Sequence, residues 1–138
     1  MVDIYIISSK YFLLDKELGI WNNYLLQSDW MALNKIKNSR AAATHALVYS
    51  IPFLLLQPSL EAWFVIFFTH FLIDRFAIAK YIAFAKTKVA PCKWWPSWKD
   101  CHVNGYNKDI PVWLSTWLLI ITDNTIHLII NYLALKYL

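Results

Sequence analysis

The sequence predicts an all-α integral membrane protein, an antiparallel bundle of three to four transmembrane helices. Hydrophobic residues make up 59% of the chain and charged residues only 16%, against about 45–50% and about 25% in ordinary soluble domains. Long apolar runs alternate with short basic connectors, and the many tryptophans and tyrosines supply aromatic side chains for both membrane interfaces. Only helices or closed barrels satisfy all backbone polar groups in lipid. We therefore expect a single transmembrane helical domain over residues 1–138.

The N-terminal part of the chain carries the weakest pattern. Residues 1–19 mix apolar and charged side chains, which indicates a lead-in or an interfacial segment. A helical pattern then runs from Ile20 to Leu33, with Asn23 and Gln27 on one face. The charged residues before Ile20 leave open whether this helix crosses the membrane.

Two apolar segments follow the basic connector 34–40. The first is an expected helix from Ala41 to Leu56, in which Pro52 predicts a kink. After a short turn, Ser59 is placed to cap the next helix. The apolar pattern from Ala62 to Lys86 predicts the longest helix of the chain.

A polar connector, residues 87–110, precedes the last helix. Pro111 is suited to the first turn of a helix, and the apolar pattern from Val112 to Leu138 is long enough to span a bilayer. The connector contains Cys92 and Cys101, which lack zinc-finger spacing and are expected to be free thiols. Its tryptophan-rich stretch 94–98 is expected to rest on the membrane interface.

The basic connectors orient this bundle. Residues 35–40 and 86–108 are rich in Lys and Arg, whereas residues 57–61 contain neither. Positive charge favours the cytoplasmic side, so we expect a multi-pass protein of the cytoplasmic membrane, with its C-terminus outside. The net charge of +4 is interpreted as this topology rather than as nucleic-acid binding.

Two His/Asp pairs lie within the apolar segments. His70 and Asp74 are one helical turn apart, and Asp123 and His127 repeat the spacing in reverse order. At about 1.5 Å per residue, both aspartates lie roughly 9 Å and both histidines roughly 15 Å from the cytoplasmic helix ends. His45 reaches a depth of roughly 7–8 Å by the same count. Ionisable groups in a spanning helix are costly unless they face partners or water, so this shared layer indicates a site.

Imidazoles and carboxylates are the ligands of zinc and other first-row divalent metals. The alternative is that buried His and Asp side chains tie the helices together by hydrogen bonds alone. In the metal interpretation, the carboxylates Asp74 and Asp123 are the catalytic residues and one of them acts as general base, while Asn23 and Gln27 orient the ligands or the substrate. The expected metal ligands are His45, His70, Asp74, Asp123 and His127.

Four stretches of the sequence form a specific combination: Gln27–Ala32, His45–Tyr49, Thr69–Arg75 and Asp123–His127. They resemble an uncharacterised family of small integral membrane proteins of bacteriophages and bacteria. The family's His/Asp pattern is similar to that of proteins labelled membrane-bound metal-dependent hydrolases. The family also has a histidine and an aspartate on the first helix, where this sequence has Gly19 and Asn23. One ligand and one carboxylate of the pattern are therefore absent.

The function expected from these observations is metal-dependent hydrolysis of a lipid headgroup or a lipid-linked phosphate near the cytoplasmic leaflet. The sequence leaves two alternatives open. One is a non-enzymatic phage membrane protein that binds a host membrane protein, as in superinfection exclusion or defence evasion. The other is a homo-oligomeric pore. Whether the protein is an enzyme, and which metal it holds, are not decided by the sequence.

Overall fold

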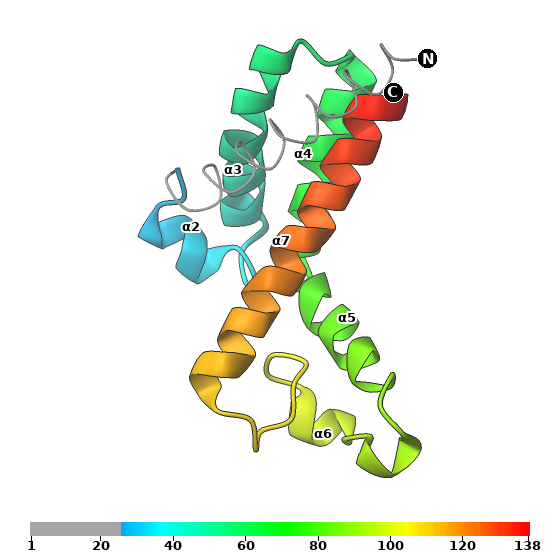
Figure 1. The fold of residues 1–138 in the computed structure, drawn as a ribbon. Coiled ribbons are helices and arrows are strands. Elements are labelled where there is room, and N and C mark those ends of the chain that lie inside the picture. The colour runs from blue at the N-terminus through cyan, green and yellow to red at the C-terminus, as the bar shows by residue number, and fades with distance from the viewer. Residues whose placement is uncertain (1–25) are drawn as a thin grey trace, which may run out of the picture. The chain divides into compact units, whose positions relative to one another are not determined.

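The computed structural model describes residues 26–138, and every regular element in this range is a helix (Figure 1). The all-α class is therefore confirmed for this part of the chain. The predicted lead-in 1–19 and the candidate residue Asn23 lie outside the described residues. In chain order, with η denoting a 3-10 helix, the elements are α2 (Asp29–Asn34), α3 (Ser39–Ser50), η1 (Ile51–Leu56), α4 (Leu60–Arg75), α5 (Ile78–Thr87), η2 (Cys92–Trp94), α6 (Trp98–Cys101) and α7 (Val112–Tyr137).

The chain divides into two compact units. The described part of the first unit comprises residues 26–76 and 127–138, and the second comprises residues 77–126. Helix α7 begins in the second unit and ends in the first. That residues 1–138 form one transmembrane domain stays a prediction.

The first unit is built on the pairing of α3 with α4. These helices lie side by side in Figure 1, and the short α2 packs against α3. The apolar core joins them to the C-terminal part of α7 through the buried residues Tyr49, Phe53, Ala62, Ile66 and Ala134.

Small residues bring the backbone of α3 close to its neighbours. Ala41, Ala42 and Ala46 are completely buried on the same helix face as His45 and Tyr49. Small side chains at helix interfaces let two backbones approach closely. The buried face of α3 therefore places a histidine and a tyrosine between alanines.

Two local sequence signals in this unit, a proline and a serine, have the predicted effects on the helix ends. Helix α3 ends at Ser50, and Pro52 lies in the 3-10 helix η1 that replaces the α-helix, since proline cannot donate the next backbone hydrogen bond. Ser59 caps α4, because its hydroxyl accepts a hydrogen bond from the Ala62 N–H at 2.9 Å.

The prediction of a helix from Ile20 to Leu33 is wrong for residues 26–28, because these residues are not helical. Helix α2 begins only at Asp29, because the preceding Ser28 has extended backbone angles (φ −76°, ψ 158°). The Ser28 hydroxyl accepts a hydrogen bond from the Met31 N–H. An N-cap of this kind starts a helix and stops one from continuing through it.

The apolar run predicted as one helix from Ala62 to Lys86 forms two. Helix α4 ends at Arg75 and α5 begins at Ile78. Between them Ala77 adopts a left-handed backbone with φ of 48°, which costs an L-residue about 1–2 kcal/mol. Neither glycine nor proline marks this break, so the hydrophobic pattern gave no sign of it.

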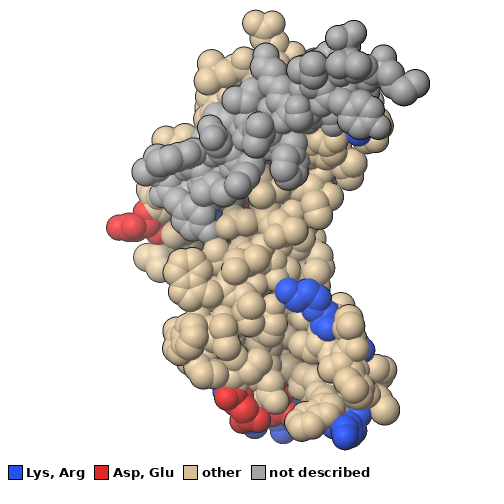
Figure 2. Space-filling model, viewed as in Figure 1, with Lys and Arg blue, Asp and Glu red and all other residues tan. Residues whose placement is uncertain are grey.

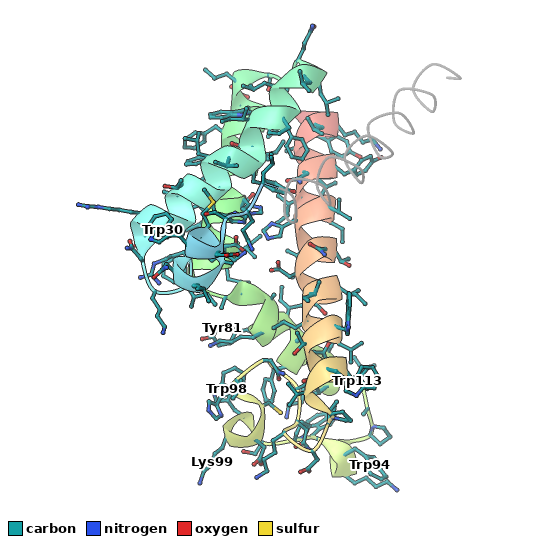
Figure 3. All side chains as sticks on the ribbon, turned by 90° about the vertical axis from the view of Figure 1, so that its left-hand side faces the viewer. Trp30, Tyr81, Trp94, Trp98, Lys99 and Trp113 are labelled. Atoms are coloured by element: carbon teal, nitrogen blue, oxygen red, sulfur yellow. The ribbon has the colours of Figure 1, made fainter. Side chains whose placement is uncertain are left out.

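In the second unit, the connector after α5 packs back onto that helix. The Trp98 ring stacks on Tyr81 with centroids 5.2 Å apart and meets Phe84 edge-on at 4.9 Å (Figure 3). A Cβ on Gly105 would collide with the carbonyl oxygen of Lys80, and Gly105 has a φ of +84°. Glycine is required where the loop passes this close to α5.

Candidate metal centre

The candidate centre lies in the first unit, around the carboxylate of Asp74. Three histidines, from α3, α4 and α7, and a lysine from the connector after α2 approach this carboxylate. Asp74 is near the end of α4, and its side chain is only 3% exposed. The His45 Nε2 atom lies 3.0 Å and the His70 Nε2 atom 3.2 Å from Asp74 Oδ2. The His127 Nε2 atom lies 3.7 Å from Asp74 Oδ1. Four of the five predicted ligands therefore meet.

Helix periodicity explains how each ligand reaches this point. His70 and Asp74 share one face of α4 at i and i+4. His45 comes from the buried face of α3, and α7 brings His127, whose ring stacks on that of His70 with centroids 4.1 Å apart. The histidines are only 1–2% exposed. The centre is therefore shielded from solvent on three sides by helices of the same unit.

Several imidazole nitrogens lie beside Asp74 without well-directed hydrogen bonds, an arrangement that a bound ion could explain. All four ring nitrogens of His45 and His70 are buried without a hydrogen-bond partner, although two of them lie 3.0–3.2 Å from Asp74. These contacts are short enough for hydrogen bonds but wrongly directed. Buried polar atoms are nearly always hydrogen-bonded, and an exception calls for an explanation such as an ion.

The spacing of the ligand atoms also suits a metal ion. One ligand atom each from His45, His70 and Asp74 falls within 4.8 Å of the others. Metal–ligand distances of about 2.0–2.1 Å in a tetrahedral site place neighbouring ligand atoms roughly 3.3 Å apart. The observed nitrogen–oxygen distances of 3.0 and 3.2 Å are close to that value. These buried His and Asp side chains could therefore hold a metal ion.

Tyr49 and Asn131 form the wall of the centre beside His70. The Tyr49 ring stacks on His70 with centroids 3.8 Å apart, and its hydroxyl accepts a hydrogen bond of 2.7 Å from Asn131 Nδ2. Both residues are buried. Tyr49 follows His45 by four residues on α3, and Asn131 follows His127 by four residues on α7, so each shares a helix face with a candidate ligand.

Lys35 also contacts the candidate centre, which the sequence did not predict. Its Nζ atom donates hydrogen bonds to Asp74 Oδ2 at 3.0 Å and to Gln27 Oε1 at 3.1 Å. In the sequence Lys35 indicates only membrane topology, because nothing local links it to a carboxylate 39 positions away. Gln27 thus contacts the centre through Lys35.

Arg75, next to Asp74 in the sequence, contacts the connection between α2 and α3. Its guanidinium donates to the Ile36 carbonyl oxygen at 2.6 Å and to the Ser39 hydroxyl at 3.0 Å. Together, Lys35 and Arg75 hold the α2–α3 connection against the end of α4.

The other candidate residues belong to the second unit. Asp123 lies on α7 one turn before His127, and its roles as ligand and catalytic carboxylate stay predictions. Cys92 is exposed and Cys101 buried, and both are free thiols. His102 is exposed on the connector. The metal-ligating groups found among residues 26–138 include none of these last three side chains.

No model of a protein family, no curated protein and no solved structure matches this chain. The fold and the site define a class by themselves: within residues 26–138 the protein is helical, has one helix that is long and apolar enough to cross a membrane, and holds a buried His/Asp cluster. The resemblance to small phage and bacterial membrane proteins stays a prediction.

Proposed function

We propose that this protein is a multi-pass membrane protein whose first unit holds a divalent metal ion and hydrolyses a phosphate-bearing lipid at the cytoplasmic leaflet. The observation that carries this proposal is the approach of three buried imidazoles to one buried carboxylate. The metal would be held by His45, His70, Asp74 and His127, and zinc suits such a ligand set.

The membrane assignment is supported by α7. It is 26 residues long, and only 22% of its most apolar window is buried, whereas the core helix of a soluble protein is mostly buried. Helices α4 and α5 together are also long and apolar enough to cross the membrane if they form one broken span. A bundle of three to four spans would require residues 39–56 and the N-terminal segment to cross as well.

Exposed apolar side chains support the same assignment. Leu60, Phe64 and Phe68 are 82%, 55% and 44% exposed on α4. On the face seen in Figure 2 most of the described surface carries no charge, and the charged side chains of the second unit include basic ones over α5 and others at the end that carries α6. Such a surface is costly in water and stable in lipid.

A divalent metal supplies Lewis acidity and lowers the pKa of a coordinated water toward neutrality. Side chains of the protein would control the access of water to the site and the local charge. The buried wall of Tyr49 and Asn131 limits access of bulk water, and Lys35 places a positive charge at the more exposed edge. A carboxylate with a remaining lone pair can accept a proton, and Asp74 is suited to this as well as to ligation.

A second candidate function is binding to a host membrane protein without catalysis. One observation favours it: α2 buries none of its residues, while Trp30, Leu33 and the following Ile36 are 50%, 76% and 53% exposed. Trp30 projects from this region in Figure 3. An apolar surface of this kind suits a partner helix as well as lipid.

Metal analysis of the full chain, purified from membranes in mild detergent, tests the proposal. We expect stoichiometric zinc or another first-row metal in the wild type and loss of that metal in His45→Ala and His70→Ala. The matched control is His102→Ala, which removes an exposed histidine outside the centre and should keep the metal. A wild-type protein that cannot be loaded with any divalent metal would refute the metal centre. Retained metal without release of phosphate from lipid substrates would favour the binding function.

A further inference from the structure

Lys35 differs from the other side chains that approach Asp74. Its side chain is 19% exposed, whereas the histidines are 1–2% and Asp74 is 3% exposed. The lysine therefore reaches from the surface of the first unit into the centre. An ammonium carries three N–H donors, and toward residues 26–138 it uses two, for Asp74 and Gln27. The third donor is not used by residues 26–138, and it could form a hydrogen bond with a ligand.

Among residues 26–138, the side chains that approach Asp74 would not balance the charge of a metal-loaded centre without an anion. Histidine ligands are neutral, so a divalent cation and Lys35 would carry three positive charges against the single negative charge of Asp74. If Asp123, one turn before His127 on α7, is counted as well, one positive charge is still in excess. Uncompensated charge in a buried place is unfavourable. An anionic ligand at the exposed edge would restore the balance.

We propose that Lys35 is the anion-binding residue of this centre and recognises a phosphate group, free or carried by a lipid headgroup. The inference rests on the proposed function, because the phosphate would compensate the positive charge of both the metal ion and the lysine ammonium. A metal ion held by Asp74 would share that carboxylate with Lys35, whose ammonium would then be available to the ligand. Lysine serves widely as a point-charge partner of phosphate, and Gln27 keeps its ammonium at the edge of the site.

Three variants separate this role from a structural one. Lys35→Met removes the charge and keeps much of the side-chain length, and Lys35→Arg retains the charge. Lys37→Met is the matched control, because Lys37 is exposed two residues further on in the same basic connector. The full chain of each variant is placed in phosphatidylcholine nanodiscs and titrated with cobalt(II), whose visible spectrum reports occupancy and ligand changes.

Inorganic phosphate is then titrated into the cobalt-loaded proteins. We expect it to perturb the spectrum of the wild type, Lys35→Arg and Lys37→Met at similar concentrations. In Lys35→Met its affinity should fall about ten- to a hundredfold, the loss expected for one charge-assisted hydrogen bond. The affinity of Lys35→Met for cobalt should be unchanged or higher, since the ammonium no longer competes for Asp74.

A second arm identifies the source of the phosphate. Nanodiscs containing phosphatidic acid are compared with pure phosphatidylcholine nanodiscs in the absence of free phosphate. A Lys35-dependent change caused by phosphatidic acid alone assigns the site to a lipid headgroup, and a response to inorganic phosphate alone assigns it to the free anion.

Two results overturn the inference while the metal centre stands. One is equal phosphate affinity in the wild type and Lys35→Met, and the other is loss of cobalt binding in Lys35→Met, which would make the lysine a structural part of the centre. If the wild type binds no cobalt, the proposed function fails and the inference falls with it.

Discussion

The ring of Tyr49 lies nearly parallel to that of His70, with centroids 3.8 Å apart and an interplanar angle of 19°. The same tyrosine is tied to α7 by the hydrogen bond from Asn131. One residue of α3 thus contacts a candidate ligand on α4 and a buried amide on α7. Its position links the shape of the centre to the packing of all three helices.

Replacing Tyr49 by Phe should keep the ring stack and leave the buried Asn131 amide without its acceptor. We expect a loss of about 1–2 kcal/mol in the free energy of unfolding, measured by denaturant titration in detergent micelles. In Asn131→Leu the same hydrogen bond is lost, so the double variant should be less destabilised than the sum of the single ones. Strictly additive losses would show that this hydrogen bond does not form.

Stripping the metal should lower the thermal stability of the wild type. A ligand that binds only the folded state adds about 2.7 kcal/mol when its free concentration is about a hundredfold above the dissociation constant. A chelator should therefore reduce the Tm of the wild type, and added zinc should restore it. Asp74→Asn should show no response to either reagent. Equal chelator sensitivity in Asp74→Asn would place the metal elsewhere.

The two cysteines should react with maleimide at very different rates. Burial and the neighbouring Asp100 carboxylate raise the pKa of the Cys101 thiol, so its thiolate fraction at neutral pH is lower than that of an ordinary thiol. Cys92 is exposed and should be alkylated first. Mass spectrometry of single-cysteine variants should show Cys101 reacting only at higher pH or after denaturation. Equal rates at neutral pH would contradict the packing of α6.

Gly105→Ala should destabilise the second unit. The added Cβ would meet the Lys80 carbonyl and lie 2.8 Å from the Ala83 Cβ, and the positive φ disfavours alanine, for an expected cost of about 1–3 kcal/mol. The Gly105 N–H donates to the Cys101 carbonyl, so accelerated alkylation of Cys101 is a local measure of the damage. Val103→Ala, at an exposed position of the same loop, should leave that rate unchanged.

Helical periodicity and local signals predicted most of the first unit. The i to i+4 spacing placed His70 beside Asp74, and the proline and serine signals set the end of α3 and the start of α4. The meeting of His45 with His70 and Asp74 followed from matching depths along separate helices. These features depend on residues that are close in sequence, or on depths counted from the same membrane surface.

Two features could not be predicted from the sequence. Lys35 reaches Asp74 because α2 packs against α3, and no residue pattern near Lys35 indicates that packing. The break at Ala77 occurs inside a continuous apolar run, at a residue that favours helix, so local propensity predicts the opposite of what is found.

The buried alanines of α3 have a consequence for the choice of ion. Ala42 and Ala46 are buried on the His45 face of α3, and side chains of one methyl group let a neighbouring helix backbone approach closely. Zinc holds its ligands at about 2.0–2.2 Å and calcium at about 2.3–2.6 Å, so a narrow gap discriminates against the larger cation. Ionic radius would therefore be selected by residues that never touch the ion, and a bulkier side chain at either alanine would widen the range of cations accepted.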